Sequence, residues 1–257
     1  MKNAKSYGLL VVTLMMLSLS ACQDSEVVNQ EPTIEELMTA ADNGEVEAQF
    51  SLAIRYDSGD GIEQSSSLAV QWFEKAAAQG DADAQFNLGL ASETGNGVPQ
   101  SFEQALYWYQ KAAKQGQAAA LSNLGVMYES GVGVKQSYST ALSYFKPAAQ
   151  KNHFPAITNL GQMYQQGKGV TQSNEQAVFW YEKSANEGQA PAQMRLGLMY
   201  EAGWGVPKSS IQAAAWYLKA ANKNEPLAQV LLGDLYAVGN GVEQSLSQAA
   251  HWYQQAA

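Results

Sequence analysis

Cysteine, histidine and basic side chains are scarce in this chain. One Cys and two His among 257 residues exclude a disulfide framework and a zinc site built from several Cys and His ligands. The 15 Lys and Arg are outnumbered by 24 Asp and Glu, which leaves a net charge of −9. Nucleic-acid binding needs clustered Lys and Arg to contact phosphates, so this balance argues against it. A hydrophobic fraction of 46% with 15% charged residues is typical of a folded protein.

The N-terminal residues have the features of an export signal. Lys2 and Lys5 precede an apolar run, residues 8–19, which has the length of a signal-peptide core and is too short to span a bilayer. The run ends in Leu19-Ser20-Ala21-Cys22, which resembles the lipobox of bacterial lipoproteins. The alternatives are an uncleaved anchor and an ordinary signal peptide with a chance Cys.

The lipobox resemblance implies a processed, membrane-anchored protein. A lipoprotein signal peptide would cover residues 1–21, Cys22 would carry acyl chains such as palmitate, and residues 22–32 would form a flexible tether. Several acyl chains on one Cys anchor a protein almost irreversibly. Gln23 after the Cys favours the periplasmic side of the outer membrane, with the inner membrane and the cell surface as alternatives.

A period of 36 residues runs through most of the remaining chain. Alanine, leucine and glycine each recur six times at this spacing without an insertion. Self-similarity at a fixed period is the signature of a repeat array. The three columns are Ala48, Ala84, Ala120, Ala156, Ala192 and Ala228; Leu52, Leu88, Leu124, Leu160, Leu196 and Leu232; and Gly61, Gly97, Gly133, Gly169, Gly205 and Gly241.

Each unit of the array carries the signals of two helices. Ala84 and Leu88, four residues apart, predict one face of a first helix that ends at Gly95. Ser101 predicts the N-cap of a second helix that ends at Gly116, and Gly or Asn recurs at this last position. The N-cap column is Ser in all six units: Ser65, Ser101, Ser137, Ser173, Ser209 and Ser245. Four units place Gln three residues after the Ser, which predicts capping boxes: Gln104, Gln176, Gln212 and Gln248.

Two aromatic columns lie at helical spacing beside the alanines, and we interpret both as core rather than as a carbohydrate cleft. One column belongs to the second helices and contains Trp72, Trp108, Tyr144, Trp180, Trp216 and Trp252. The other belongs to the first helices and contains Tyr56, Tyr128, Tyr164, Tyr200 and Tyr236, with Ser92 in the second unit. This Ser predicts that the core between the first and second repeats contains less apolar side-chain volume.

The unit as a whole resembles the Sel-one-like repeat (SLR) family, which is related to the tetratricopeptide repeat. The pattern is Ala-x-x-x-Leu-Gly-x-x-Tyr-x-x-Gly-x-Gly-Val followed by Ala-x-x-Trp-Tyr-x-Lys-Ala-Ala-x-x-Gly. The resemblance covers residues 33–257, with a half unit at 33–44 and six units from about residue 45. It implies an all-α, right-handed α-solenoid of antiparallel helix pairs, whose usual work is to hold other proteins together.

Two further departures from the pattern predict local consequences. Pro147 in the third unit removes a backbone donor inside the second helix, so we expect a kink or an early helix end there. The last unit stops at Ala257 without a polar capping helix. Solenoids need end caps to stay soluble, so we expect this helix either to fray or to meet a partner or a second copy of the chain.

No arrangement of reactive side chains is apparent, so the sequence predicts a protein that is not an enzyme and needs no metal or cofactor. His153 and His251 lie nearly three units apart, too far to pair as ligands or as a base and nucleophile. The Gly-x-Gly pairs follow helices in every unit, which indicates turns and not a phosphate loop. Glu93, Glu129 and Glu201 share one column, which we interpret as solvated surface.

The best binding candidates lie on the outward column of the first helices, which line the concave face of such solenoids. An amide donates to and accepts from a peptide group at once, so an Asn column could grip an extended chain. In the alternative interpretation these residues only solvate the surface. The candidate peptide-binding residues are Asn87, Asn123, Asn159 and Arg195.

The leading hypothesis is therefore an envelope-anchored scaffold that binds a protein partner or extended peptide. It would contact the membrane through the lipid anchor on Cys22. One alternative is a periplasmic immunity lipoprotein that blocks a delivered toxin. A weaker alternative is a β-lactam hydrolase, because some cysteine-rich SLR proteins have been associated with that activity, and this chain lacks their paired cysteines.

Overall fold

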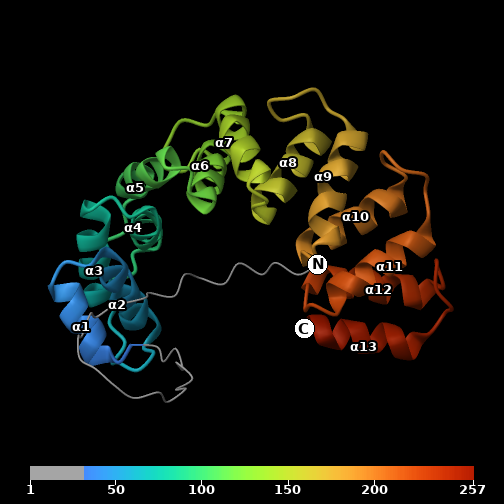
Figure 1. The fold of residues 1–257 in the computed structure, drawn as a ribbon. Helices are drawn as coiled ribbons and strands as arrows, with labels where there is room; N and C mark the ends of the chain where they lie inside the picture. The colour runs from blue at the N-terminus through green and yellow to red at the C-terminus, as the bar shows by residue number, and fades with distance from the viewer. Residues whose placement is uncertain (1–31) are drawn as a thin grey trace, which may run out of the picture. The chain divides into compact units, whose positions relative to one another are not determined.

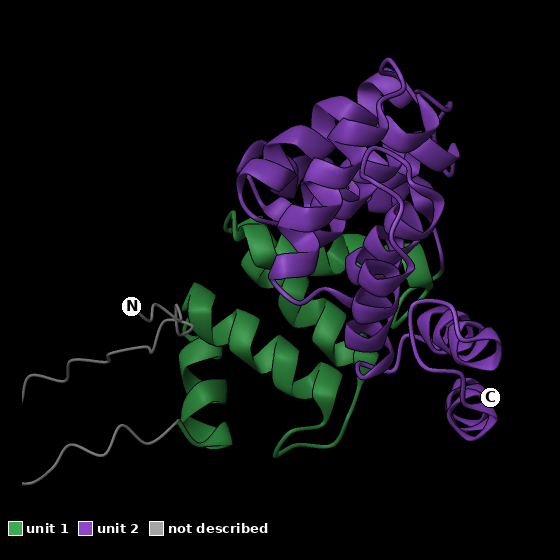
Figure 2. Ribbon diagram, turned by 90° about the vertical axis from the view of Figure 1, so that its right-hand side faces the viewer, with its two compact units in different colours: residues 1–99 green, residues 100–257 purple. Residues whose placement is uncertain are grey.

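The computed structural model describes residues 32–257, which contain α-helices and no strands (Figure 1). The predicted signal peptide, Cys22 and nearly all of the predicted tether lie outside the described residues. The chain divides into two compact units, residues 1–99 and residues 100–257 (Figure 2). We call them unit 1 and unit 2 and treat each separately.

Unit 1 contains four described helices and unit 2 contains nine. The helices of unit 1 are α1 (Ile34–Asp42), α2 (Val46–Ser58), α3 (Ser66–Ala78) and α4 (Ala82–Thr94). The helices of unit 2 are α5 (Phe102–Lys114), α6 (Ala118–Ser130), α7 (Tyr138–Gln150), α8 (Phe154–Gln166), α9 (Asn174–Asn186), α10 (Ala190–Ala202), α11 (Ser210–Ala221), α12 (Pro226–Val238) and α13 (Leu246–Ala256).

Within each unit, every helix packs against its neighbours in the chain. The tightest pairs are a first helix with the second helix of the same repeat, such as α2 with α3 and α6 with α7. Successive repeats then join through contacts such as those between α7 and α8, and α6 and α8 also touch directly. The predicted all-α solenoid with 36-residue repeats is confirmed.

Helix ends form as the Gly and Asn residues predict. The first helices end in a Gly with left-handed backbone, such as Gly95 with φ of 78°. After the second helices, Asn152 and Asn224 take φ of 58° and 60°, where the other repeats place Gly. A short amide side chain tolerates this conformation better than other non-Gly residues do.

The six N-cap serines are confirmed, but the predicted capping boxes are wrong. Each Ser side chain accepts the backbone N–H three residues later, as Ser173 does from Gln176 at 3.1 Å. A capping box also needs the Ser backbone N–H to donate to the Gln side chain. That N–H is already used, because Ser173 donates it to the carbonyl of Tyr164 at 2.9 Å. Ser209 and Ser245 do the same with Tyr200 and Tyr236.

The expected early end at Pro147 does not occur. Helix α7 continues to Gln150, and the backbone N–H of Lys151 reaches the carbonyls of Pro147 and Ala148. Pro147 removes a single backbone bond in the last part of the helix, and the following Ala148 and Ala149 are buried in the core. Packing of this turn therefore outweighs the lost hydrogen bond.

The predicted aromatic columns border the core more than they fill it. Trp72 and Trp252 are buried, whereas the other members of the Trp column are half-buried. The deepest aromatic side chains form a column that the sequence analysis did not single out: Phe73, Tyr109, Phe145, Tyr181 and Tyr217. The rings of Phe145, Tyr181 and Tyr217 each lie against a Gly of the first helix, and a Cβ on Gly161 would come within 2.6 Å of the Tyr181 ring.

Buried glutamines tie successive repeats together. Gln49 donates its side-chain N–H to the carbonyl of Ala41 at 3.1 Å, and Gln193 donates to Ala185 at 3.1 Å. Each bond joins the start of a first helix to the end of the preceding second helix. The bond satisfies a carbonyl that the helix end leaves without an intrahelical donor.

Candidate functional site

The predicted peptide-binding residues lie at equivalent positions of four first helices. Asn87 is on α4 in unit 1, whereas Asn123, Asn159 and Arg195 are on α6, α8 and α10 in unit 2. All four side chains are half-buried, with one part in the packed surface and one part open to water. Unit 2 therefore brings three of the four onto consecutive repeats.

These side chains differ in what they already bind. The Asn87 amide donates to the carbonyl of Asp83 at 2.8 Å, one turn earlier in its own helix. The structure gives Asn123 and Asn159 no hydrogen-bond partner among its described residues. The Arg195 guanidinium lies beside the Tyr181 hydroxyl. The amides of α6 and α8 are thus free to bind a peptide group, whereas Asn87 is partly engaged.

Tyrosines of the second helices point their hydroxyl groups at polar residues of the first helices. The Tyr181 hydroxyl donates to Gln165 at 2.8 Å, and the Tyr217 hydroxyl donates to Glu201 at 2.6 Å. Burial raises the pKa of Tyr181 to about 12, against an opposing effect of the Arg195 guanidinium. Burial is also the main cause of the raised pKa of Tyr217, and the Glu201 carboxylate adds to it.

The carboxylate column is therefore not simply solvated. Besides the bond from Tyr217 to Glu201, Lys168 forms an ion pair with Glu129 at 3.3 Å. The Glu129 side chain keeps only 17% of its exposure. Both carboxylates therefore bind their own chain: Glu201 joins the two helices of one repeat, and Glu129 joins neighbouring repeats.

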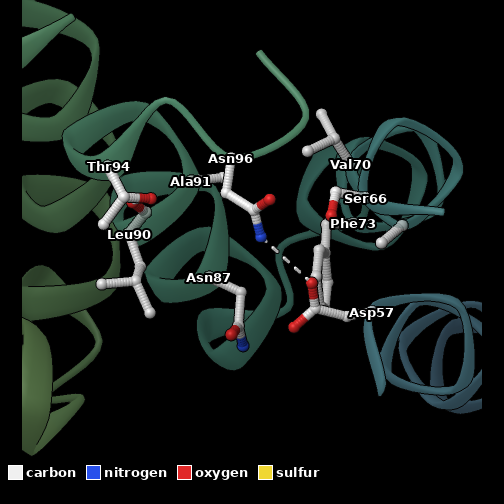
Figure 3. Close-up of a pocket in the computed structure, with 10 residues that line it drawn as sticks. Asp57, Ser66, Val70, Phe73, Asn87, Leu90, Ala91, Thr94 and Asn96 are labelled. Atoms are coloured by element: carbon white, nitrogen blue, oxygen red, sulfur yellow. Dashed lines mark hydrogen bonds between the residues drawn. The ribbon is translucent and has the colours of Figure 1, made fainter. Parts of the chain in front are cut away.

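Unit 1 contains a pocket that sequence reasoning missed. It has a volume of about 230 Å³ and lies between α3 and α4, beside the loop that follows α4 (Figure 3). The signal that could have found it is Ala91, where the equivalent residues of the next four repeats are Met127, Met163, Met199 and Leu235.

Groups suited to catalysis or metal binding do not gather in the described residues. No cluster of His, Cys, Asp and Glu there could hold a metal ion. His153 occupies the N-cap position of α8 without a side-chain capping bond, and burial lowers the pKa of its imidazole. His251 packs edge-on against Trp252 in α13. No described helix is long and apolar enough to cross a bilayer.

Comparison with known families matches the Sel1 repeat to six consecutive segments: residues 46–81, 82–117, 118–153, 155–189, 190–225 and 226–257. The chain belongs to the Sel1 repeat family. Sel1 repeats generally serve as scaffolds for protein interaction, and the fold described above is of this kind. A comparison with curated proteins found no match.

Solved structures of other Sel1 repeat proteins share this fold. A protective antigen of uropathogenic Escherichia coli with an SLR fold is 37% identical, with a TM-score of 0.80 over 88% of this chain. The match covers 48% of that antigen, so this chain spans about half its length. A Sel1 repeat protein from Oxalobacter formigenes is 34% identical, with a TM-score of 0.83 over 87% of this chain and 90% of the other. An immunity protein from Pseudomonas aeruginosa is 21% identical, with a TM-score of 0.53 over 82% of each chain, and shares the fold alone.

Proposed function

We propose that this Sel1 repeat protein is an envelope-anchored scaffold that holds an extended segment of a partner protein along the first helices of unit 2. One observation carries the proposal: Asn123 and Asn159 occupy equivalent positions of adjacent repeats and keep their amides free of protein partners among the described residues. A half-buried amide without a partner is poised to bind something that the chain itself does not supply.

The spacing of the repeats suits an extended peptide. Packed helices lie about 8–10 Å apart, and an extended chain advances about 3.3 Å per residue. Amides on adjacent repeats would therefore meet peptide groups about three residues apart. Each amide can donate to one carbonyl and accept from one N–H, which grips the backbone without selecting particular side chains.

The positive charge of Arg195 extends this surface by one repeat. Its guanidinium lies beside the Tyr181 hydroxyl, in the same column as the two amides. A partner segment with a carboxylate beyond its Asn-bound stretch would gain a charge-assisted hydrogen bond there. The envelope location rests on the resemblance of residues 19–22 to a lipobox.

Partner capture in intact cells tests the scaffold. A variant with Asn123→Ala and Asn159→Ala should lose most of the crosslinked partner, while its thermal unfolding stays within about 2 °C of the parent because both side chains lack protein partners. The matched control removes two amides from exposed positions of second helices, with Gln176→Ala and Gln212→Ala, and should capture the partner normally. Equal capture by both double variants, or the absence of any partner for the parent chain, would contradict the proposal.

A role as an immunity protein against a delivered toxin is the second candidate. Its support is the charge of unit 1, where residues 32–99 carry twelve acidic side chains and two basic ones. A surface with this charge attracts basic partners and accelerates their association. The test is protection of a susceptible strain by the chain when a toxin encoded beside it is delivered to the periplasm.

A further inference from the structure

The pocket between α3 and α4 is lined by both apolar and polar residues (Figure 3). We call the apolar lining residues the floor, namely Ala69, Val70, Phe73, Leu90 and Ala91, and the polar ones the rim, namely Asp57, Ser66, Asn87, Thr94 and Asn96. All ten residues belong to unit 1. Apolar walls with a few convergent polar groups are the usual composition of a ligand site.

The pocket exists because two facing positions are both small. Ala91 of α4 stands where unit 2 has Met127, Met163 and Met199, which are fully buried. Ser66 of α3 stands where the next two repeats have Phe102 and Tyr138, although a later repeat also has Ser, at position 210. The repeats of unit 2 therefore fill the equivalent space mainly from the Ala91 position, with Met or Leu.

The rim presents oxygen atoms to the pocket. Asn96 uses its amide N–H to donate to Asp57 at 3.3 Å, and Thr94 donates its hydroxyl to the carbonyl of Leu90 at 2.9 Å. Asn87 donates in the same way to Asp83 at 2.8 Å. These bonds use the N–H and O–H donors, so the rim has acceptor oxygens left for a ligand that donates hydrogen bonds.

Two repeats further along the chain, the positions equivalent to Asp57 and Asn96 hold a carboxylate and a lysine. Glu129 occupies the position of Asp57, and Lys168 occupies the position of Asn96. Those two residues form an ion pair at 3.3 Å. In unit 1 an amide replaces the ammonium, so Asp57 binds a neutral group where Glu129 binds a cation. Residues 32–99 carry a net charge of −10, which raises the attraction for a cation further.

We propose that the α3–α4 pocket receives a lysine side chain from the partner protein. The four methylene groups of lysine would cover the floor as the buried methionines do in unit 2. The ammonium would donate to the Asp57 carboxylate and to the side-chain oxygen of Asn96, which lies beside it. Lysine fits this rim because it has three donors and no acceptor on an unbranched apolar stem. The partner itself is part of the proposed scaffold function, on which this step rests.

Titration of the full chain with Nα-acetyl-lysine N-methylamide tests the pocket directly. In ¹H–¹⁵N spectra, the side-chain amide signals of Asn87 and Asn96 should shift and saturate. The norleucine derivative, which has the same stem without the ammonium, should bind at least about tenfold more weakly, since a charged hydrogen bond is lost. Equal binding of the two derivatives would overturn the proposal.

Three variants assign the binding to this pocket. Ala91→Met fills it with the residue that unit 2 uses, so the variant should fold, show an equal or higher melting temperature and bind no lysine derivative. Asp57→Asn should weaken binding about tenfold while the pocket stays open. Glu63→Gln removes the same charge from an exposed position outside the pocket and should bind normally. Binding by Ala91→Met, or equal weakening by Asp57→Asn and Glu63→Gln, would overturn the proposal.

The same variants separate this inference from the scaffold function. If a partner is captured through Asn123 and Asn159 but Ala91→Met captures it equally well, the pocket proposal fails and the scaffold stands. If the parent chain captures no partner, the scaffold fails, and the lysine titration still decides whether the pocket recognises a basic side chain.

Discussion

Replacement of Gly161 by Ala should destabilise unit 2, although Ala is the better helix former. Gly161 lies in α8, and an added Cβ would lie 2.6 Å from two ring carbons of Tyr181 in α9. Carbon atoms normally pack at about 3.5–4.0 Å, so the ring or the helix must move by about 1 Å. Tyr181 is fully buried, and its hydroxyl is held by Gln165 at 2.8 Å, so the ring has no free direction in which to move.

Two opposing effects set the size of the change. Overfilling a packed core costs about 1–3 kcal/mol, and Ala gains about 1 kcal/mol over Gly inside a helix. The expected result is therefore a loss of up to about 2 kcal/mol in the free energy of unfolding. Urea unfolding followed by far-UV circular dichroism measures it, with the slope against urea compared between the variants.

The same substitution in a Tyr181→Ala variant shows whether the Tyr181 ring causes the loss of stability. With Tyr181→Ala already in place, Gly161→Ala should have the opposite sign and stabilise the chain by about 1 kcal/mol, because only helix propensity remains. Repeat one already contains Ala53 at this position, opposite Phe73, so Ala is compatible with the column where the ring leaves room. A gain in stability on the parent background would refute close packing of α8 on α9.

Two further predictions concern helix capping and pH. Ser173→Ala should lower the free energy of unfolding by about 1 kcal/mol in urea titrations. Gln176→Ala should change it by less than about 0.5 kcal/mol, because only the Ser half of the capping box forms. An equal loss in the two variants would indicate that the complete box exists. Burial raises the pKa of Tyr181 to about 12 from about 10 in an unfolded chain, so the neutral hydroxyl stabilises the fold below pH 10, and this effect disappears as the pH rises to 12. Relative to Tyr181→Phe, the parent chain should lose up to about 3 kcal/mol over that range, and parallel pH profiles of the two proteins would contradict the burial of this hydroxyl.

The sequence predicted the parts of the fold that depend on local backbone chemistry. Serine at the start of the second helices and Gly or Asn after them act within one turn, so their roles follow from position alone. Asn224 takes the left-handed conformation because the next helix must begin in a new direction there. A property shared by all six repeats can be predicted from the sequence, because the 36-residue period assigns each residue to one position of the repeat.

Features that need two helices at once were not predictable in the same way. Gln176 has the spacing of a capping box, but the N–H that it would accept is taken by the carbonyl of Tyr164 in the preceding helix. Tyr181 and Trp180 are neighbours in the chain, yet only Tyr181 is fully buried, because it faces Gly161. Adjacent aromatic residues look alike in the sequence, and the partner helix decides which of them enters the core.

The sequence predicted which kinds of side chain could bind a partner, but not which of them lack a hydrogen-bond partner within the chain. The column of Asn residues is visible from the period, but the structure distinguishes Asn87, whose amide binds Asp83, from Asn123 and Asn159. The α3–α4 pocket depends on Ser66 and Ala91, which lie on different helices and are unremarkable singly. A comparison of equivalent positions across the repeats would have found it, since Ala91 is small where every repeat of unit 2 has Met or Leu.

Function in such an array is therefore best sought where the repeats differ. Positions that carry the same residue in every repeat, such as the Ser caps and the Ala columns, are explained by helix stacking. A partner could not use these positions to distinguish one repeat from another. Ala91 in place of Met, and Asn96 in place of Lys168 two repeats on, give unit 1 an open acidic pocket that its sister repeats fill from within. An acidic pocket in unit 1 and free amides in unit 2 are therefore two different chemistries on one chain, and each has to be tested by itself.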